Sequence, residues 1–417
     1  MEPVRTSTPS ARNRDEAAEL DTADELRGFR GRFVIDPAVV YLDGNSLGCL
    51  SRATQARLER IVTQWGDRGV RGWDEGWLEL PIDVGDRLGA AVLGAAPGQT
   101  VIGDSTTVCF YKLVRAALDA RPGRSQIVTD VDNFPTDRYV LEGIARERGL
   151  ELVWLCGDRY GPTPDEVAAR IGAETAVVTF SHVSYRSAHI ADMAGVNAIV
   201  RDAGALMLWD LSHSAGSVPI SLDGDHAPLA VGCTYKYLNG GPGAPAFMYV
   251  RRELQAELRQ PIWGWLGRRD PFEMAPGYEV APGMQGFLSG TPPILSLAAV
   301  DEGVRLIAEA GIEAIRAKAI ALTELAVKLA DAVLAPLGVS VASPRDAAHR
   351  GAHVALAHPD AQRLCARLIE RGVIPDYRRP DVIRFGCSPL TTRFVDVWDG
   401  VEALRELAAT AAPPGSG

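Results

Sequence analysis

Lys236 has the clearest chemical setting of any residue in this sequence. It lies in GCTYKYLNGGPGAPAFMYV, between an apolar run and a Gly/Pro-rich turn, where rigid backbone can hold an amine at a sheet edge. The chain has only four lysines, and Lys112, Lys318 and Lys328 fall in helical patterns beside charged residues, where solvated ammonium groups are expected. An amine that forms a Schiff base must be partly desolvated, so that its neutral form is accessible. Lys236 is the candidate for that chemistry, although most single lysines are surface charges.

Asp210 ends the apolar run ALMLWD, where a strand leaves the sheet and where α/β folds bind ligands. A carboxylate there can pair with the protonated ring nitrogen of pyridoxal phosphate (PLP) and keep the ring an electron sink. His213 follows closely and can reach the same ring. Taken alone, Asp210 is about equally well explained as a helix N-cap or turn residue, and a lone histidine there is more often structural.

Two further motifs suit the phosphate and the ring of the same cofactor. DSTT (104–107) opens a helical stretch, and hydroxyls with free backbone N–H groups at a helix N-terminus suit a phosphate dianion. Simple N-capping is the commoner use of such residues. NFPTD (133–137) places Phe134 in a turn, where it can stack on a pyridine face. An ordinary Asn/Pro turn with a core phenylalanine is the alternative.

Arg384, in DVIRFGCSPL, lies on a predicted strand near the C-terminus. A guanidinium there can hold the α-carboxylate of an amino acid through two parallel hydrogen bonds. Arginine is abundant in this chain, so a surface ion pair is the default interpretation of any one of them.

The elements that must position these residues follow an alternating pattern. Strand-like runs separated by helical segments predict a mostly parallel α/β sheet; the runs are SQIVTD, LELVWL, TAVVTFSHV, ALMLWD and PAFMYV. Residues 261–293 are rich in Gly, Pro and Trp, which predicts an irregular segment of the active site. After residue 293 a long helical pattern precedes short strands and helices, which are typical of a smaller α/β domain.

The expected organisation is a large domain over residues 51–293 and a small domain formed by residues 26–50 together with 294–410. Residues 1–25 are polar and predict a loose arm, and residues 411–417 predict a disordered tail.

Composition excludes several classes of function. The formal net charge of −10 argues against a nucleic-acid or anionic-membrane partner. No apolar run approaches the roughly 20 residues of a membrane span, and the first 25 residues hold no signal-peptide core. The six cysteines form no C-x-x-C pair, so neither a disulfide framework nor a structural metal site is expected. A cytoplasmic location fits this cysteine usage.

Together these motifs resemble one family, the kynureninases, which are PLP-dependent enzymes of fold type I in the aminotransferase class V group. The matching stretches run in the family's order: YLDGNSLG (41–48), GDSTTV (103–108), NFPTD (133–137), WDLSHSAGSVP (209–219), TYKYLNGGPGA (234–244), GWLG (264–267), GTPPILSLA (290–298), RGAHVALAH (350–358) and IRFG followed by PL (383–390). They cover almost the whole chain, and YLDGNSLG with NFPTD and YKYLN is highly specific.

The resemblance implies a role for each matching residue. Catalysis is expected from Lys236, which would carry the cofactor, with Asp210, Tyr235 and Asp137. The implied cofactor-binding set is Thr106, Thr107, Phe134, Pro135, Thr136, Asp137, Ser181, Asp210, His213, Tyr235, Lys236, Trp265 and Thr291. The implied substrate-binding set is Arg384, Trp73, Asn45 and Ser46. The family is homodimeric with active sites at the subunit interface, and Trp265 and Thr291 resemble positions contributed by the neighbouring subunit.

The implied reaction is hydrolysis of the Cβ–Cγ bond of L-kynurenine, or of its 3-hydroxy relative, to anthranilate (or 3-hydroxyanthranilate) and L-alanine. This sequence departs from the family at three positions. Thr391 replaces the usual aromatic residue, Arg268 replaces a common histidine, and Thr234 replaces a serine. The departures at Thr391 and Arg268 put the specificity for the aryl group in doubt.

Within the same fold the alternative is a cysteine desulfurase or selenocysteine lyase, which needs a reactive cysteine on a mobile loop. Cys387 is the best-placed candidate. A cofactor-binding or regulatory protein without catalysis is a third interpretation.

Overall fold

A seven-stranded sheet is the centre of the fold. The computed structural model describes residues 11–410, and the predicted tail (411–417) and the first ten residues lie outside that range. The strands are β2 (Thr100–Ile102), β3 (Gln126–Asp130), β4 (Glu151–Leu155), β5 (Thr175–Ser181), β6 (Leu206–Asp210), β7 (Leu229–Gly232) and β8 (Phe247–Val250). Their order is β2-β8-β7-β6-β5-β3-β4. Strand β8 runs antiparallel to β2 and β7 on either side of it, and the other four pairings are parallel, so the prediction of a mostly parallel sheet is confirmed.

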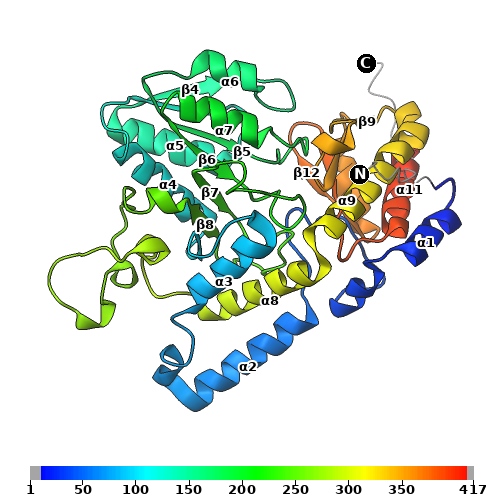
Figure 1. The fold of residues 1–417 in the computed structure, drawn as a ribbon. Coiled ribbons are helices and arrows are strands. Elements are labelled where there is room, and N and C mark those ends of the chain that lie inside the picture. The colour runs from blue at the N-terminus through cyan, green and yellow to red at the C-terminus, as the bar shows by residue number, and fades with distance from the viewer. Residues whose placement is uncertain (1–10, 411–417) are drawn as a thin grey trace, which may run out of the picture.

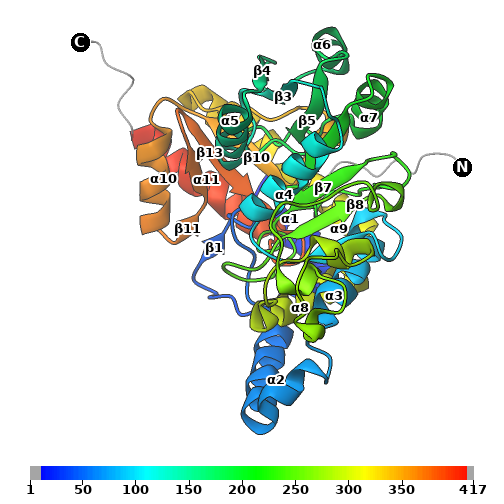
Figure 2. The ribbon, with the colours of Figure 1, turned by 90° about the vertical axis from the view of Figure 1, so that its left-hand side faces the viewer.

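Helices cover both faces of this sheet, and in Figure 2 strands β3 and β5 lie between α5 and α7. One face packs against α4 (Thr106–Asp119) and α5 (Pro135–Arg148), and the other against α3 (Leu80–Leu88), α6 (Pro164–Arg170), α7 (Met193–Asp202) and α8 (Ile294–Ala310). Side chains on a strand alternate between faces. In β6, Leu206 and Leu208 join the α4/α5 core, whereas Met207 and Trp209 join the opposite core. This explains why the strands are apolar runs with no alternation.

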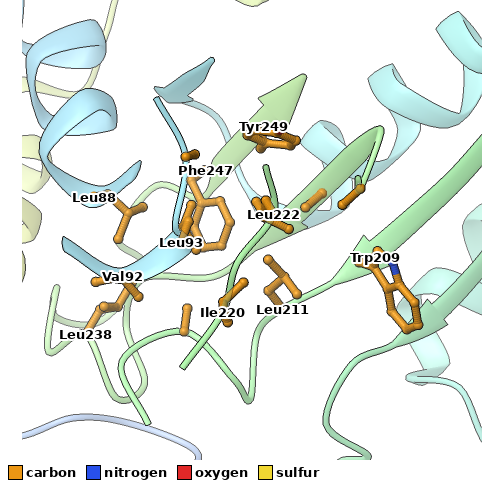
Figure 3. Close-up of a cluster of buried hydrophobic side chains, with 14 of the residues drawn as sticks. Leu88, Val92, Leu93, Trp209, Leu211, Ile220, Leu222, Leu238, Phe247 and Tyr249 are labelled. Carbon is orange, nitrogen blue, oxygen red and sulfur yellow. The ribbon is translucent and has the colours of Figure 1, made fainter. Parts of the chain in front are cut away.

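The core on the α3 side is built from large apolar side chains. Figure 3 shows Phe247 of the sheet close to Leu88 and Leu93, which come from α3 and the turn of π-helix after it. Leu211, Leu222 and Trp209 continue the same cluster on the other side of Phe247. Burying each such side chain contributes about 1.5–3 kcal/mol. This packing supports the carboxyl edge of the seven-stranded sheet.

A second, smaller sheet lies beside the first (Figure 1). Its antiparallel strands follow the order β12-β13-β10-β9, formed by β9 (Ser340–Val341), β10 (His353–Ala357), β12 (Asp376–Arg378) and β13 (Val382–Gly386). Helices α9 (Ile312–Leu329), α10 (Ala361–Glu370) and α11 (Phe394–Thr410) share its core. A short parallel pair, β1 (Val40–Tyr41) with β11 (Val373–Ile374), ties the YLDGNSLG segment to this domain.

Helices α8 and α9 link the two cores. Gly311, with φ of +78°, separates them, and α8 packs against α3 and α2 (Arg52–Arg68) while the second half of α9 joins the small core. The exact boundary between the two domains stays a prediction.

The expectation of a loose arm is wrong for residues 14–23, which form helix α1 (Arg14–Ala23). Asn13 caps this helix, and Asp21 accepts hydrogen bonds from the backbone N–H groups of Phe394 and Val395 at the start of α11. Arg14 pairs with Asp399 at 2.7 Å. Ala17 is also buried in the small core and Leu20 packs against it, but these few apolar residues form no stripe that would have predicted the helix.

The expectation of solvated lysines is wrong at two positions. Lys112 has no exposed side-chain surface and pairs with Asp104 at 2.5 Å. Lys318 is buried with Asp24, at 2.7 Å. Carboxylate partners replace water around both ammonium groups.

Residues 261–293 contain neither α-helix nor strand, only short 3-10 turns, as predicted. Within residues 11–410, no helix combines the length and apolar character needed to cross a bilayer.

Candidate active site

The carboxyl edge of the large sheet brings the predicted chemical residues together. Asp210 ends β6 opposite Ser181, which ends β5, and Lys236 follows β7. A cavity of about 180 Å³ opens at this edge. Its lining is Ser105, Thr106, Thr107, Phe134, Thr136, Asp137, Asp210, Ser212, Tyr235, Lys236, Gly243 and Ala244. Sequence reasoning missed Ser105, Ser212, Gly243 and Ala244, although all four lie within or beside the quoted motifs.

Lys236 is held in a buried position beside His213. Its side chain is 7% exposed, and its Nζ lies 3.2 Å from Nε2 of His213. Burial, more than any neighbouring charge, lowers the pKa of Lys236 below its usual value. Burial and then the charge of Lys236 lower the pKa of His213 well below its usual range. Burial therefore disfavours the charged form of both the amine and the imidazole.

The backbone of Lys236 is pinned from two directions. Gly48, in the YLDGNSLG motif, donates its N–H to the carbonyl oxygen of Tyr235 at 2.8 Å. A Cβ at Gly48 would lie 2.3 Å from the carbonyl oxygen of Lys236, so only glycine fits there. Thr234 donates its hydroxyl to the carbonyl oxygen of Pro245 at 2.6 Å. The YLDGNSLG motif, through Gly48, is thus needed for the placement of Lys236.

Asp137 and Asp210 form a buried carboxyl pair. Burial, followed by the negative charge of Asp210 and a hydrogen bond with it, raises the pKa of Asp137 well above its usual value. The site therefore disfavours a negative charge on Asp137 beside Asp210. Asp210 accepts from the N–H of Ser212 at 2.8 Å, while Oδ2 of Asp137 is buried without a partner among the described residues. Such an orphaned oxygen fits a donor that a bound group would bring.

The start of α4 faces the cavity with its Ser-Thr-Thr sequence. Ser105 caps the helix, its Oγ accepting from the N–H of Val108 at 3.4 Å. The first N–H groups of any helix lack partners within the helix and carry its positive dipole end. Thr106 and Thr107 add hydroxyls at the same place, so this end of the cavity suits a dianion.

Two aromatic rings lie near the amine. Nζ of Lys236 is 5.6 Å from the ring centroid of Phe134 and 5.9 Å from that of Tyr235. Burial, and then the neighbouring Cys233, raises the pKa of Tyr235 above its usual value. Its phenol is therefore a proton donor at neutral pH.

Arg384 lies on β13 of the small domain and is almost fully buried, outside the cavity lining. Its Nε donates to Oδ1 of Asp376 at 2.7 Å, and its Nη1 to the carbonyl oxygen of Tyr185 at 2.6 Å. Ser46 lies 3.3 Å from Nη2. With its amide oxygen oriented toward the guanidinium, Asn45 accepts from Nη2 at 3.1 Å. The structure thus brings together the predicted substrate-binding residues except Trp73.

Asp376 was not predicted as part of this group. It pairs with Arg384 in register across β12 and β13. Opposite charges on neighbouring strands of a hairpin are the signal that could have identified it.

Several predicted residues lie elsewhere in the same chain. Trp73 packs edge-on against Trp77, with ring centroids 5.4 Å apart, and Trp265 packs against Phe272 at 5.6 Å. Thr291 lines a neighbouring cavity of about 270 Å³ that shares Ser105 with the first. Ser181 donates its hydroxyl to Asn133 at 2.9 Å, and Pro135 begins α5. None of these five lines the Lys236 cavity in the described chain.

The departures from the family pattern have structural surroundings of their own. Thr391 is buried, and its carbonyl oxygen accepts a hydrogen bond from Arg30. Arg268 donates to three backbone carbonyls, those of Gly277, Arg269 and Asp270. Neither residue lines the Lys236 cavity in the described chain.

Cys387 does not have the setting of a catalytic thiol. Its side chain is fully buried in the small core, and burial raises its pKa to about 12. A reactive cysteine needs an exposed, electropositive site that lowers the thiol pKa. The geometry therefore gives no support to cysteine desulfurase chemistry at this residue.

The residues present fit PLP on four counts: a buried amine, an orphaned carboxyl oxygen beside a second carboxylate, a helix N-terminus with hydroxyls, and an aromatic ring near the amine. All of these meet at one cavity.

Comparison with solved structures places the fold. A cysteine desulfurase from Thermococcus onnurineus NA1 superposes with a TM-score of 0.81 over 92% of this chain and 98% of that chain, at 18% identity. A cysteine desulfurase from Escherichia coli superposes with a TM-score of 0.78 at 16% identity, over 92% of this chain and 98% of that chain. At such low identity these likenesses show the fold alone, which is that of PLP-dependent fold type I as predicted.

Sequence comparison identifies the family. A kynureninase from Burkholderia pseudomallei is 44% identical over 409 residues, which cover 96% of this chain and 97% of the relative. A kynureninase from Pseudomonas fluorescens is 40% identical over 94% of this chain and 95% of the relative. The family model of the kynureninase C-terminal domain matches residues 315–404. The cavity motifs and these full-length relationships agree: the chain belongs to the kynureninase family.

Proposed function

We propose that the protein hydrolyses the Cβ–Cγ bond of L-kynurenine, giving anthranilate and L-alanine, with 3-hydroxy-L-kynurenine as the second candidate substrate. The full-length relationship to kynureninases supports this activity. The single structural observation that carries it is the buried Lys236 amine at one cavity with the Asp137–Asp210 pair.

The cofactor of this reaction is PLP. Lys236 would hold its aldehyde, Asp210 its ring nitrogen and the start of α4 its phosphate. Phe134, whose ring centroid is 5.6 Å from the Lys236 amine, would lie near the ring. When bound, PLP supplies the electron sink that makes bond breaking at the amino-acid side chain possible.

The chain's own residues orient the substrate and move protons. The Lys236 amine, with its lowered pKa, can take the proton from Cα of the substrate and hold it. His213, kept neutral by burial, offers the amine a hydrogen-bonding partner that adds no charge. Arg384, with Asn45 and Ser46, is the group that would hold the α-carboxylate.

The bond-breaking step consumes one water molecule and needs no other co-reactant. Water adds its oxygen to the side-chain ketone carbon Cγ, the Cβ–Cγ bond breaks, and the aryl fragment leaves as a carboxylic acid. The electron pair stays on Cβ, which must take up a proton. Tyr235, protonated because burial raises its pKa, is the proposed donor.

We propose further that the protein acts as a homodimer in the cytoplasm. Trp265 and Thr291 lie outside the cavity of their own chain, and the 261–293 segment exposes Trp263, Phe272 and Met274 at 66%, 61% and 72%. A second subunit that covers this apolar surface would bring such residues to the neighbouring site. All six cysteines are free, which fits a reducing compartment.

Steady-state turnover of the PLP-loaded protein tests the proposal. L-kynurenine and 3-hydroxy-L-kynurenine are compared while the aminobenzoate product and alanine are followed, with L-cysteine as the control substrate. Alanine and aminobenzoate in equal amounts are expected. Sulfide from cysteine without alanine from either kynurenine would overturn it.

A further inference from the structure

Lys112, on helix α4, is a buried lysine that the mechanism above does not use. Its ammonium donates to Oδ2 of Asp104 at 2.5 Å and to the carbonyl oxygen of Phe287 at 3.0 Å. Burying an ammonium is costly unless it is paired and hydrogen-bonded. Lys112 does not line the Lys236 cavity, so its contacts must matter through other residues.

The partner, Asp104, has an unusual backbone. Its φ is +57°, in the left-handed region that residues other than glycine adopt rarely and that aspartate and asparagine tolerate better than most. Ala246 fixes the turn from one side: its carbonyl oxygen accepts from the N–H of Gly103 and its N–H donates to the carbonyl oxygen of Asp104, both at 2.9 Å. Lys112 holds the carboxylate from the other side. A strained conformation of this kind persists only where the surroundings fix it.

The left-handed turn decides where α4 begins. Ser105 follows it in an extended conformation and caps the helix, and Thr106 is the first helical residue. The hydroxyls and free N–H groups at this end reach the cavity only because the chain reverses at Asp104. Losing the turn would rotate the end of the helix away from the cavity.

The second contact of Lys112 extends to the irregular segment. Phe287 ends a short 3-10 turn (Gly283–Phe287), and the chain continues into Leu288 and Thr291. The neighbouring cavity is lined by Asp104 on one side and by these two residues on the other. Lys112 therefore joins the turn at Asp104 to the segment that carries Thr291.

We propose that Lys112 is a positioning residue for the phosphate of PLP, acting through the Asp104 turn that aims the start of α4 at the cavity. This inference rests on the proposed PLP-dependent function. The effect comes from geometry, because Asp104 pairs with the ammonium at 2.5 Å and offsets its charge. It should therefore concern the phosphate and leave recognition of the ring and aldehyde unchanged.

The test compares PLP with pyridoxal, which has the same ring and aldehyde but no phosphate. Apoprotein is titrated with each, and Kd is measured from the visible absorbance. The first variant, Asp104→Ala with Lys112→Met, removes both charges together, since a buried pair that loses one partner can prevent folding. It also gives the turn a residue that rarely adopts a positive φ. The second, Asp104→Gly with Lys112→Met, also removes the pair but gives the turn a residue that adopts a positive φ freely.

For the Ala/Met variant, Kd for PLP should rise about tenfold or more, the size expected when charge-assisted hydrogen bonds to a phosphate are misaligned. Its Kd for pyridoxal should stay within about twofold, the usual scatter for an untouched site. The Gly/Met variant should recover most of the PLP affinity. Parallel losses for PLP and pyridoxal, or no loss for either, would overturn the inference, as would a Gly/Met variant no better than Ala/Met. Wild-type protein that binds neither compound would instead overturn the proposed function.

Discussion

The amine of Lys236 and the imidazole of His213 lie 3.2 Å apart, and both are buried. Burial is the largest cause of the lowered pKa of each group, and each positive charge would further disfavour the other. Both groups are therefore biased toward their neutral forms. A neutral lysine amine at neutral pH is the requirement for carrying an aldehyde cofactor.

Lys236 should be the only lysine that becomes linked to PLP. Borohydride reduction of the PLP-loaded protein, followed by peptide mass spectrometry, should place the cofactor on Lys236 and leave Lys112, Lys318 and Lys328 unmodified. Lys236→Ala should lower kcat by about 10³-fold or more, because it removes both the attachment point and the proton carrier. Cofactor found on another lysine, or turnover that survives in Lys236→Ala, would contradict the assignment.

His213→Gln should lower kcat about tenfold, because the amine loses an aligned partner, and should leave the pH–rate profile in place. The pKa of His213 is lowered well below its usual value, so the imidazole stays neutral from neutral pH down to well below its ordinary titration range. Wild-type protein and the variant should therefore share the same acidic limb. An apparent pKa near 6.5 that is present in wild type and lost in the variant would show that His213 titrates during turnover.

The Asp137–Asp210 pair should respond unequally to amide substitution. Asp137 has the raised pKa and resembles a protonated acid, so Asp137→Asn should change kcat/KM less than about tenfold. Asp210→Asn removes the carboxylate for the ring nitrogen and should cost about 10³-fold. Equal losses in the two variants would show that the proton is not held at Asp137.

The same pair affects stability in a pH-dependent way. Because the pKa of Asp137 is raised by folding, its protonated form stabilises the folded state at low pH. That contribution is lost as pH rises from the unfolded pKa of about 3.9 toward the folded value. The Tm of wild-type apoprotein relative to Asp137→Asn should therefore fall over this range; a constant difference would contradict the raised pKa.

The features that sequence predicts here are those that depend on local pattern. Asp210 and Lys236 follow apolar runs that could only be buried strands, so their place at the sheet edge follows from strand order alone. The DSTT and NFPTD turns begin helices for reasons contained in a few residues. Local rules sufficed to place most of the cavity lining.

Features that depend on distant segments were not predictable in the same way. Helix α1 is held by Asp21 contacts to α11, across more than 370 positions of sequence. Lys112 resembles a surface lysine until Asp104 and the carbonyl oxygen of Phe287 are brought around it. In each case the deciding partner lies on an element whose position only the tertiary fold determines.

Arg384 should control recognition of the α-carboxylate, with Asp376 keeping the guanidinium in place. Burial alone would raise the pKa of Asp376, but the hydrogen bond and charge of Arg384 keep it below its usual value, so the carboxylate is ionised. Arg384→Lys cannot keep the hydrogen bonds to Asp376 and Tyr185 and still hold a carboxylate through two bonds. KM for L-kynurenine should rise about tenfold or more.

The decarboxylated analogue kynuramine provides the matched control for this effect. It keeps the aryl ketone and the amine, so its inhibition constant should change less than about twofold in Arg384→Lys. Asp376→Asn should raise KM for L-kynurenine as well, because the amide holds the guanidinium less firmly than a carboxylate does. If kynuramine binding falls in parallel with L-kynurenine, Arg384 supports the packing between the two domains and does not read the carboxylate.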